Sequence, residues 1–502
     1  MRELPRLLPE DEHNAALLAN VSPHDWKNPT PADRYNLVVI GAGTAGLITA
    51  AVASGLGAKV ALVERALLGG DCLNAGCVPS KSLIAAANAA HLMRRAARFG
   101  VNGHQPRIDF ERVHRHVHEV IAGIAPTDSQ ERFEGLGVRV IRAHASFCAR
   151  DEIEAGGERV RARRFVIAAG SRPAVPPIPG LAEVPYVTNE TVFENRSVLA
   201  HLIVIGGGPI GCELAQAHRR LGSEVTVVDL GPVLPKDDPE LTRIVREQLQ
   251  ADAVVIHERV EVRSVAQAGN GIALTIEADG ASLRIEGSHL LVAAGRAPRV
   301  EGLNLEAAGV AYGKAGIEVD RRLRTSNKHI FAIGDVIGGY QFTHVGSYHA
   351  GIVIKNALFR LPAKVDYRAL PWVTYTDPEL AQVGLSEARA RQDGQATQVL
   401  RWSFEDNDRA RTERDTLGFI KVVVGKRGRI LGASIVGAHA GELILPWVLA
   451  IRERLRIGAM AELIVPYPTR GEVSKRAAGA FYAPKLFNPR TRWLVRQLGR
   501  LG

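Results

Sequence analysis

The apolar and polar positions near the start of the chain predict a strand–helix–strand unit. An apolar run at residues 35–40 leads directly into the glycine-rich stretch Gly41–Gly46, and an alanine-rich segment follows. A second apolar run at residues 59–63 ends at Glu64. Continuous apolar runs bounded by glycine are typical of buried parallel strands, so these residues indicate a βαβ unit.

The same pattern recurs in the middle of the chain. Residues 202–205 lead into Gly206–Gly211, and a second apolar run at residues 224–228 ends at Asp229. In both copies the acidic residue falls 18 positions after the last glycine of the loop. The repeat therefore predicts two related nucleotide-binding domains in tandem.

The remaining residues predict a mixture of strands and helices. Short alternating segments at residues 138–141 and 164–167 predict added β structure. From about residue 366 the pattern changes to alternating strands, at residues 418–424 and 430–436, followed by helices. We therefore expect an α/β protein with two Rossmann-like dinucleotide-binding domains and a C-terminal α+β domain.

Composition limits the class of protein. The chain has 502 residues, 46% of them apolar, which predicts about three domains. It lacks an apolar run of the roughly 18 residues that a membrane-spanning helix needs. A polar N-terminus and only four cysteines favour a reducing compartment, so we expect a cytoplasmic protein. The net charge of +10 favours anionic partners, but no basic–aromatic array typical of nucleic-acid binding is present.

The glycine loops indicate what the two domains bind. Glycines at these positions let the backbone approach a pyrophosphate at a helix N-terminus, and Glu64 and Asp229 are placed to accept hydrogen bonds from a ribose diol. Asp229 would repel a 2′-phosphate, and residues 230–232 offer no arginine to bind one. NADH is therefore expected over NADPH.

Cys72 and Cys77 form a close pair just after the first glycine loop. Positions i and i+5 of a regular α-helix place their Cα atoms roughly 8–9 Å apart, beyond the ~7 Å limit for a disulfide. If the sulfurs pair, the helix is distorted there, and Gly76 and Pro79 supply the irregularity. No further Cys or His nearby supports a metal site, so we expect a redox-active pair and no bound metal.

From about Tyr35 to about Ala480 the chain resembles the flavin-dependent pyridine nucleotide–disulfide oxidoreductases, which include glutathione reductase, dihydrolipoamide dehydrogenase and mercuric reductase. The motifs that carry the resemblance are GAGTAG with Glu64, CLNAGCVPSK, GGGPIGCE, HIFAIGD, FTHVGSYHA and YPTRGE. The resemblance implies a homodimer built from FAD, NAD(P), FAD-return and dimerisation domains. The expected boundaries are an N-terminal extension at 1–34, an FAD-binding domain at 35–185 and 300–365, an NAD-binding domain at 186–299, a dimerisation domain at 366–487 and a basic amphipathic tail at 488–502.

The resemblance also implies roles for individual residues. Cys72 is expected to exchange with substrate, and Cys77 to be the thiolate against the flavin. Lys81 is expected near the flavin N5, paired with Glu213. The residues expected to bind FAD are Gly41, Gly43, Thr44, Ala45, Gly46, Glu64, Arg65, Gly70, Asp71, Gly170, Ser171, Gly334, Asp335, Phe342, Thr343 and His344. Those expected to bind NAD are Gly206, Gly208, Pro209, Ile210, Gly211, Asp229, Gly295 and Arg296.

The chain departs from the disulfide-reducing relatives at Tyr467, where they carry a histidine that serves as acid and base; Glu472 is retained. A phenol of pKa about 10 is a poor base at neutral pH, whereas histidine at about 6.5 is well suited. Mercuric reductases also carry tyrosine there, yet this chain has neither their C-terminal cysteine pair nor an N-terminal Cys-x-x-Cys domain. We expect a mercuric-reductase-like enzyme that reduces a soft metal ion or a small disulfide.

Two further features leave alternatives open. Asp71 stands beside Cys72, where many relatives have threonine, and its charge is expected to raise the pKa of Cys72. In the tail, residues 493–495 and Leu498 alternate with arginines, which fits a basic amphipathic helix on a membrane or a segment packed on the dimer. Membrane contact is the less favoured reading. The rival function is an electron-transfer flavoprotein or redox sensor that docks on a protein or membrane component through residues 1–33 and the tail.

Overall fold

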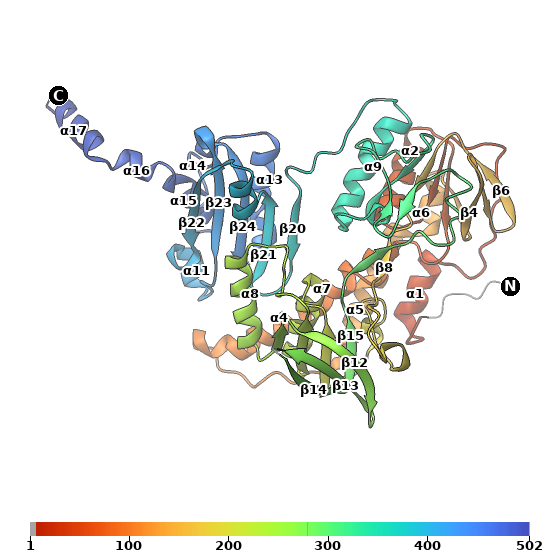
Figure 1. Ribbon diagram of the computed structural model, residues 1–502, viewed down its shortest axis with the longest axis horizontal. Coiled ribbons are helices and arrows are strands. Elements are labelled where there is room, and N and C mark those ends of the chain that lie inside the picture. The colour runs from red at the N-terminus through yellow and green to blue at the C-terminus, as the bar shows by residue number, and fades with distance from the viewer. Residues whose placement is uncertain (1–6, 279, 501–502) are drawn as a thin grey trace. The chain divides into compact units, whose positions relative to one another are not determined.

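The computed structural model describes residues 7–278 and 280–500, which fall into two compact units (Figure 1). The first unit comprises Met1–Gly206, Ala217–Leu230 and Val260–Val365, and the second comprises Gly207–Gln216, Gly231–Arg259 and Asp366–Gly502. The expected domain boundaries are not tested by this division and stay a prediction.

A five-stranded parallel sheet forms the centre of the first unit, with the strand order β19–β7–β1–β2–β3. The apolar runs at residues 35–40 and 59–63 form β1 and β2, as predicted. The segments predicted as added β structure, 138–141 and 164–167, belong to this same sheet as β3 and β7. The bounds are β1 (Leu37–Ile40), β2 (Val60–Glu64), β3 (Arg139–Arg142), β7 (Phe165–Ile167) and β19 (Ile330–Ala332).

A second parallel arrangement repeats this plan, with β9 between β10 and β15. These strands are β9 (His201–Ile205), β10 (Glu224–Asp229) and β15 (His289–Val292). Two antiparallel sheets accompany them, formed by β4 (Ala145–Ala149), β5 (Glu152–Ala155) and β6 (Glu158–Arg161), and by β12 (Glu261–Ala268), β13 (Gly271–Ala278) and β14 (Ala281–Gly287). Two strand pairs complete the unit, β8 (Ser171–Pro173) with β16 (Arg296–Pro298) and β17 (Tyr312–Gly313) with β18 (Gly316–Ile317).

Helices flank the first parallel sheet, and α2 packs against β1, β2 and α9. The helices of this unit are α1 (Glu12–Val21), α2 (Thr44–Gly55), α3 (Gly70–Asn74), α4 (Cys77–Arg95), α5 (Phe110–Ile124), α6 (Gln130–Gly135) and α9 (Thr343–Ala357). Short 3-10 helices are η1 (Ala96–Phe99), η2 (Ala125–Asp128), η3 (Leu181–Glu183), η4 (Val192–Glu194) and η5 (Gly334–Ile337). The core between the sheets is apolar and includes Phe147 and Phe165, whose rings meet edge to face at 5.3 Å.

The described part of the N-terminal extension packs onto its own unit. Helix α1 buries Leu17 and Val21, and Asn14 Oδ1 lies 3.1 Å from His118 Nδ1 of α5. The Val21 carbonyl accepts a hydrogen bond from the Leu68 amide, just before the cysteine pair. The buried face of α1 is therefore part of the scaffold, and the docking role of residues 7–33 stays a prediction; residues 1–6 lie outside the described residues.

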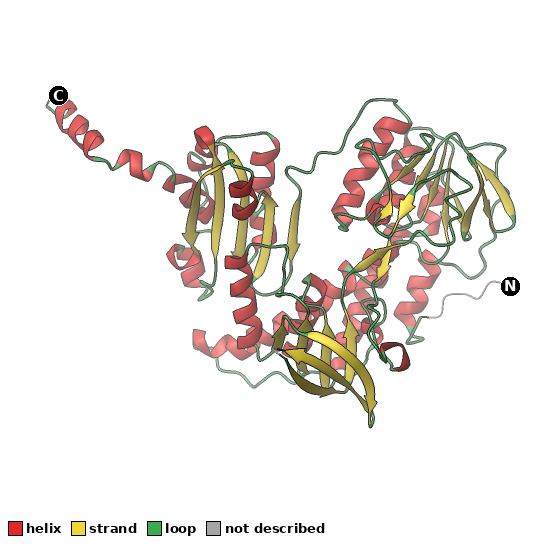
Figure 2. Ribbon diagram, viewed as in Figure 1, coloured by secondary structure: helices red, strands yellow, loops and turns green. Residues whose placement is uncertain are grey.

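The second unit is built on a five-stranded antiparallel sheet with the order β20–β21–β24–β23–β22 (Figure 2). Its strands are β20 (Pro371–Thr374), β21 (Glu379–Gly384), β22 (Ala396–Ser403), β23 (Phe419–Gly425) and β24 (Ile430–Gly437), and β11 (Val255–Glu258) also lies in this unit. Trp447 is fully buried in the core of this unit and donates its indole N–H to Ser474 Oγ at 3.0 Å.

Many short helices belong to this unit, and α7 (Pro209–Arg220) belongs partly to each unit. The others are α8 (Pro239–Ala251), α10 (Glu387–Gln392), α11 (Asp408–Thr412), α12 (Ala440–Leu443), α13 (Leu445–Arg452), α14 (Ile457–Ala461), α15 (Glu472–Ala480), α16 (Ala483–Leu486) and α17 (Pro489–Leu498), with 3-10 helices η6 (Phe404–Asp406) and η7 (Lys426–Gly428). Among the described residues, no helix combines the length and the apolar character that crossing a membrane requires.

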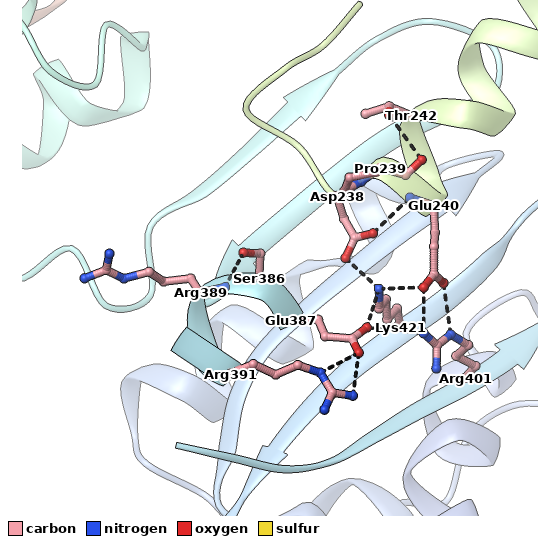
Figure 3. A network of polar contacts seen from close by, with 10 residues as sticks. All are labelled: Asp238, Pro239, Glu240, Thr242, Ser386, Glu387, Arg389, Arg391, Arg401 and Lys421. Atoms are coloured by element: carbon pink, nitrogen blue, oxygen red, sulfur yellow. Dashed lines mark hydrogen bonds and ion pairs between the residues drawn. The ribbon is translucent and has the colours of Figure 1, made fainter. Parts of the chain in front are cut away.

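A buried ion-pair network joins α8 to the sheet (Figure 3). The ammonium of Lys421 on β23, which is 3% exposed, lies 2.7 Å from Asp238, 2.6 Å from Glu387 and 3.2 Å from Glu240. Arg401 donates to both carboxylate oxygens of Glu240 and to Glu387 Oε2, and Arg391 donates to Glu387 Oε1. Removing one charged member of such a network leaves its partners without a counter-charge, which destabilises the fold. The charged residues of this network therefore stabilise the fold only together.

Candidate active site

The first glycine loop connects β1 to α2 and is shaped by its acidic residue. Gly41 has φ +103°, and a Cβ there would lie 2.4 Å from the Ala168 carbonyl oxygen, so only glycine fits. Glu64, at the end of β2, accepts hydrogen bonds from the amides of Ala42 at 2.6 Å and Ala66 at 2.7 Å. Each carboxylate oxygen can accept a second bond, which the expected ribose contact would use.

A close backbone contact joins this loop to the segment that carries the cysteines. The Gly69 amide donates to the Ala42 carbonyl at 2.9 Å. A Cβ on Gly70 would lie only 2.6 Å from the Cα of Gly43, and Gly70 has φ +59°. Helix α3, which contains Cys72, therefore begins directly against the glycine loop.

The helix that carries the cysteine pair is broken at Gly76, as predicted. Cys72 lies in α3, Cys77 is the first residue of α4, and Gly76 between them has φ −123° and ψ −110°, far from helical values. A Cβ on Gly76 would lie 2.8 Å from the Asp71 carboxylate. The expected distortion at Pro79 is wrong, because Pro79 lies in the first turn of α4, where proline is tolerated.

Both cysteines are free thiols here, and their surroundings give them different acidities. The pKa of Cys77 is lowered to about 6, first by a hydrogen bond from Cys72, then by the Thr343 hydroxyl and the positive charge of Lys81, against the opposing effect of burial. The Cys77 sulfur lies 3.4 Å from Thr343 Oγ1 at the start of α9. The pKa of Cys72 is raised, because its proton is shared with Cys77 and because it is partly buried. At neutral pH the pair is thus a Cys77 thiolate next to a Cys72 thiol.

The charge of Asp71 raises the pKa of Cys77. The pKa of Cys72 is raised as well, with Cys77 and burial as the largest causes, and the expected contribution of Asp71 to it stays a prediction. The Asp71 carboxylate accepts a hydrogen bond from Asn189 Nδ2 at 3.1 Å and pairs with Arg296 at 3.3 Å. These two partners partly neutralise the charge of Asp71 and so weaken its effect on the neighbouring thiol.

Asp335 lies in a polar cluster at the end of β19. Ser171 Oγ donates to Asp335 Oδ2 at 2.6 Å, and Arg296 Nε donates to Ser171 Oγ at 2.7 Å. Burial raises the pKa of Asp335, opposed by the Ser171 hydrogen bond and the Arg296 charge. Arg296, expected among the NAD residues, thus lies with Asp335 and Asp71 of the expected FAD group. Gly170 and Gly295 precede the two strands of this cluster, β8 and β16, with φ +72° and +124°.

The residues at the start of α9 surround the same region. The rings of Phe342 and His344 stack at 5.3 Å, and Thr343 between them contacts Cys77. The Gly334 amide donates to His349 Nδ1 at 3.1 Å, and a Cβ on Gly334 would meet the Ala45 methyl at 3.4 Å. The FAD residues expected from motifs separated by up to about 300 positions are thus brought together in one unit.

The second glycine loop repeats the design of the first. Gly206 has φ +117°, and its Cβ would lie 2.4 Å from the Ala293 carbonyl oxygen, as Gly41 meets Ala168. No atom lies within 4 Å of a Cβ built on Gly208. Gly206, Asp229 and Lys81 belong to the first unit, whereas Gly208, Pro209, Ile210, Gly211 and Glu213 belong to the second. Glu213 is buried and accepts the Tyr375 amide at 2.9 Å; its expected ion pair with Lys81 stays a prediction.

Tyr467 lies in the second unit with a carboxylate partner. Its side chain is 69% exposed, and its hydroxyl donates to Asp408 Oδ2 at 3.0 Å. The hydrogen bond to Asp408 and its negative charge raise the pKa of Tyr467. Glu472 begins α15 and lies 3.9 Å from Arg476. The phenol is therefore held protonated at neutral pH and is not available there as a base.

Three residues of this region were not found from the sequence. Asn189 ties Asp71 to the Ala75 carbonyl at 3.1 Å, across the break between α3 and α4. Arg299 donates to the Ser171 carbonyl, and its pKa is lowered by burial and by the charges of Arg65 and Arg296. Asp408 is the partner of Tyr467. None of them lies in a recognisable motif, and each contacts its partner across a long sequence separation, so no local pattern indicates it.

We expect Thr343→Val to raise the pKa of Cys77 from about 6 toward its ordinary value of 9.0, because the substitution removes a hydroxyl that stabilises the thiolate. Since the thiolate is the reactive form, the pH of half-maximal alkylation of the reduced protein by iodoacetamide rises. Ser347→Ala is the matched control, because it removes a hydroxyl from the same helix that contacts only the Thr343 carbonyl among the bonds described. Coinciding profiles for the two variants would contradict this assignment.

Comparisons with known proteins agree with this geometry. Residues 35–350 match the pyridine nucleotide-disulphide oxidoreductase family, and residues 370–478 match the dimerisation domain of that family. A mercuric reductase of Streptomyces lividans is 35% identical over 455 residues, which cover 89% of this chain and 96% of the relative. A dihydrolipoyl dehydrogenase of Staphylococcus aureus is 34% identical over 449 residues, covering 88% and 95%.

A solved structure shows the same fold. The Cu(II) complex of the HOCl-induced flavoprotein disulfide reductase RclA from Escherichia coli superposes with a TM-score of 0.80 at 27% identity, and the match covers 89% of this chain and all of that one. Sequence relatives, domain content and fold therefore agree: the chain belongs to the class I pyridine nucleotide–disulfide oxidoreductases, which are FAD-dependent enzymes.

Proposed function

We propose that this enzyme uses the Cys72–Cys77 pair to pass two electrons from NADH to a soft metal ion or a small disulfide. The observation that carries the proposal is the pair itself. Cys77 has a pKa of about 6 and a hydroxyl and a cation beside it, whereas the pKa of Cys72 is raised. Two thiols of unequal acidity suit a site in which one sulfur holds charge and the other exchanges.

The first glycine loop and the Asp335 cluster fit FAD. The loop presents backbone where a Cβ would block approach, and Arg65, Arg296 and Arg299 gather positive charge suited to a pyrophosphate. Asp335, oriented by Ser171, would bind the ribityl hydroxyls, and Arg296 would keep that carboxylate ionised. When bound, FAD supplies a two-electron carrier between a nicotinamide and the cysteine pair.

The chain's own groups determine where protons and electrons come to rest. Reduction of the Cys72–Cys77 disulfide breaks one S–S bond with two electrons and takes up one proton near neutral pH. Cys77 remains a thiolate because its pKa is about 6, and Cys72 keeps the proton. Cys77 is packed closely enough for burial to oppose the lowering of its pKa, yet part of the residue is exposed, which leaves surface open for contact with a flat ring.

Release of the electrons then uses Cys72. With a disulfide substrate, Cys72 loses its proton as its sulfur attacks one sulfur of the substrate, and that proton goes to the first thiol displaced; Cys77 then attacks Cys72, which restores the disulfide and releases the second product as a thiolate. With a soft metal ion, both sulfurs bind the ion, the Cys72 proton is released to water, and two electrons pass from the two sulfurs to the ion as the Cys72–Cys77 disulfide re-forms; no proton donor is needed, because a thiolate is itself the preferred ligand. The two substrate classes therefore differ in whether they need an acid or base at residue 467.

Tyr467 favours the metal ion. Its phenol donates to Asp408 and has a raised pKa, so it does not accept a proton from Cys72 at neutral pH. Relatives in the comparison include mercuric reductases, and the neighbouring RclA structure is a Cu(II) complex. A soft metal ion is therefore our first candidate and a small disulfide the second.

Further support concerns the donor, the assembly and the compartment. Asp229 ends β10 at the position where a carboxylate selects a free ribose, which favours NADH over NADPH. Leu445, Leu449 and Ile464 of the dimerisation domain are 67%, 57% and 98% exposed, as a homodimer interface requires. In such a dimer the partner would supply Tyr467 and Glu472 to the site. Four free cysteines fit the reducing cytoplasm.

The location of FAD predicts an effect of Gly70→Ala. The new Cβ would lie 2.6 Å from Gly43 Cα and push the cysteine segment off the glycine loop, so the purified variant should hold several-fold less flavin, measured as the ratio of flavin to protein absorbance. Gly57→Ala is the matched control, because Gly57 also has a positive φ, +82°, but no atom within 4 Å of the added Cβ. Equal flavin content in both variants would contradict FAD binding at this loop.

The roles of the two sulfurs predict a split between Cys72→Ser and Cys77→Ser. In an anaerobic NADH titration, the long-wavelength thiolate–flavin absorbance should persist in Cys72→Ser and vanish in Cys77→Ser, while both variants lose turnover. Turnover is screened with Hg(II), Cu(II), glutathione disulfide, lipoamide and quinones, with NADH and NADPH compared. Absorbance retained in Cys77→Ser would reverse the assignment, and turnover that survives in Cys72→Ser would remove the dithiol from the reaction.

The base missing at residue 467 predicts a gain of function. Tyr467→His should raise turnover of a small disulfide roughly tenfold or more, within the ~10²–10⁴-fold range of general acid–base catalysis, and leave soft-metal turnover nearly unchanged. Asp408→Asn is the control, because it removes the partner of the phenol without adding a base. A variant whose metal turnover falls while its disulfide turnover stays flat would show that Tyr467 acts on the metal instead.

A further inference from the structure

The C-terminal end of the chain is uniformly basic. Residues 473–502 contain no Asp or Glu, and their basic residues are Lys475, Arg476, Lys485, Arg490, Arg492, Arg496 and Arg500. Elsewhere in the second unit most surface arginines are paired with carboxylates, as Arg389 is with Asp393 and Arg409 with Glu413. Arg476 lies 3.9 Å from Glu472, but the segment after it contains no carboxylate side chain to balance its remaining basic residues.

Helix α17 gives this segment a defined shape. Pro489 is its first residue, and the Asn488 side chain accepts the Thr491 amide at 2.9 Å, which caps the helix N-terminus. None of its residues is buried, and Figure 1 shows the helix at the blue C-terminal end of the chain. The capped helix forms without an apolar face packed on its own chain.

Its side chains divide into two faces. Leu494 and Leu498 are one turn apart, with Val495 beside them, and these three are 49%, 55% and 62% exposed. Arg492 and Arg496 are also one turn apart and lie on the opposite side, since Arg496 is two residues, or about 200°, from Leu494. Phe487 precedes the helix, and Trp493 is three residues, or about 60°, from Arg496 on the side of the arginines; both are exposed, at 68% and 57%, and add aromatic surface. The helix thus has an apolar strip at Leu494, Val495 and Leu498 and a cationic side at Arg492 and Arg496, and Arg490 lies one turn before Leu494 at the start of the apolar strip.

Charge decides between the two occupants that an exposed amphipathic helix would have. A second copy of this chain carries a net charge of +10, so its surface as a whole repels the arginines. A surface of anionic lipids complements the arginines and takes the apolar side into its acyl boundary, and tryptophan and phenylalanine are suited to that boundary. The length of ten residues is short, so binding would be reversible.

We propose that α17 and its flanks, residues 483–498, bind the surface of an anionic membrane and place the enzyme there peripherally. Binding needs both faces of the helix, because neither a short apolar side nor a few charges alone holds a protein of this size. It requires no turnover, so it stands whether or not the proposed substrate is correct.

The test is flotation of the full-length holoenzyme with vesicles. We expect it to float with phosphatidylcholine vesicles that contain a quarter phosphatidylglycerol and to stay at the bottom with phosphatidylcholine alone. Raising the salt from about 0.1 M to about 1 M, which shortens the Debye length from ~10 Å to ~3 Å, should release it. Arg492→Glu with Arg496→Glu, and separately Leu494→Ser with Leu498→Ser, should each lower the bound fraction at least about tenfold.

Arg112→Glu with Arg115→Glu on α5 is the matched control, because it makes the same change of charge at an exposed site outside the tail. Its flotation should equal that of the wild type; an equal loss in this control would reduce the effect to net charge and overturn the proposal. Equal flotation with neutral and with anionic vesicles would also overturn the proposal, and so would tail variants that float like the wild type. A tail variant that becomes monomeric in light scattering, with flotation unchanged, would assign the tail to a second copy.

Discussion

The contact between two glycine backbones, Gly43 and Gly70, is the constraint on which the proposed site depends. It brings the segment before the cysteines against the loop that opens α2, and the amide of Gly69 fastens it by a hydrogen bond to Ala42. A Cβ at Gly70 would lie 2.6 Å from the Cα of Gly43 and force the two segments apart, whereas a Cβ at Gly43 would meet Gly70 at 3.9 Å, an ordinary contact. The cysteine pair is thereby built onto the edge of a parallel sheet, where ligands of such folds bind.

Once placed there, the two sulfurs are made unequal by their neighbours. The proton on Cys72 stabilises the charge on Cys77, and the Thr343 hydroxyl and the Lys81 charge add to this, while Asp71 opposes it. Asp71 is in turn restrained by Arg296 and Asn189, residues more than a hundred positions away. The acidity of Cys77 thus depends on several elements of the unit, whereas its position depends on the single break in the helix at Gly76.

Features that depend on local pattern could be predicted from the sequence. The glycine loops with their acidic residues, the strands before and after them, and the break at Gly76 follow from apolar runs, spacing and the reach of a disulfide. The pairing of Arg296 with Asp335 and Asp71, the link made by Asn189 and the partner of Tyr467 could not be predicted. These contacts depend on how distant segments meet after folding, and a single sequence carries no periodicity that records such meetings. The packing of residues 12–21 on α5 was missed for the same reason, because the segment is short and mostly polar.

The network around Lys421 has a consequence for how the enzyme responds to acidity. Burial would lower the pKa of Lys421, but its hydrogen bonds to Asp238 and Glu387 raise it; hydrogen bonds from Arg401 and Lys421 lower the pKa of Glu240, and those from Lys421 and Arg391 lower that of Glu387. Stability from the glutamates is lost only as pH falls below their ordinary value of about 4.3, and stability from the lysine only as pH rises above about 10.4. Cys77 titrates near 6, well inside that window. The reactive sulfur can therefore gain or lose its proton while Lys421, Glu240 and Glu387, which hold α8 and α10 to the C-terminal sheet, stay charged.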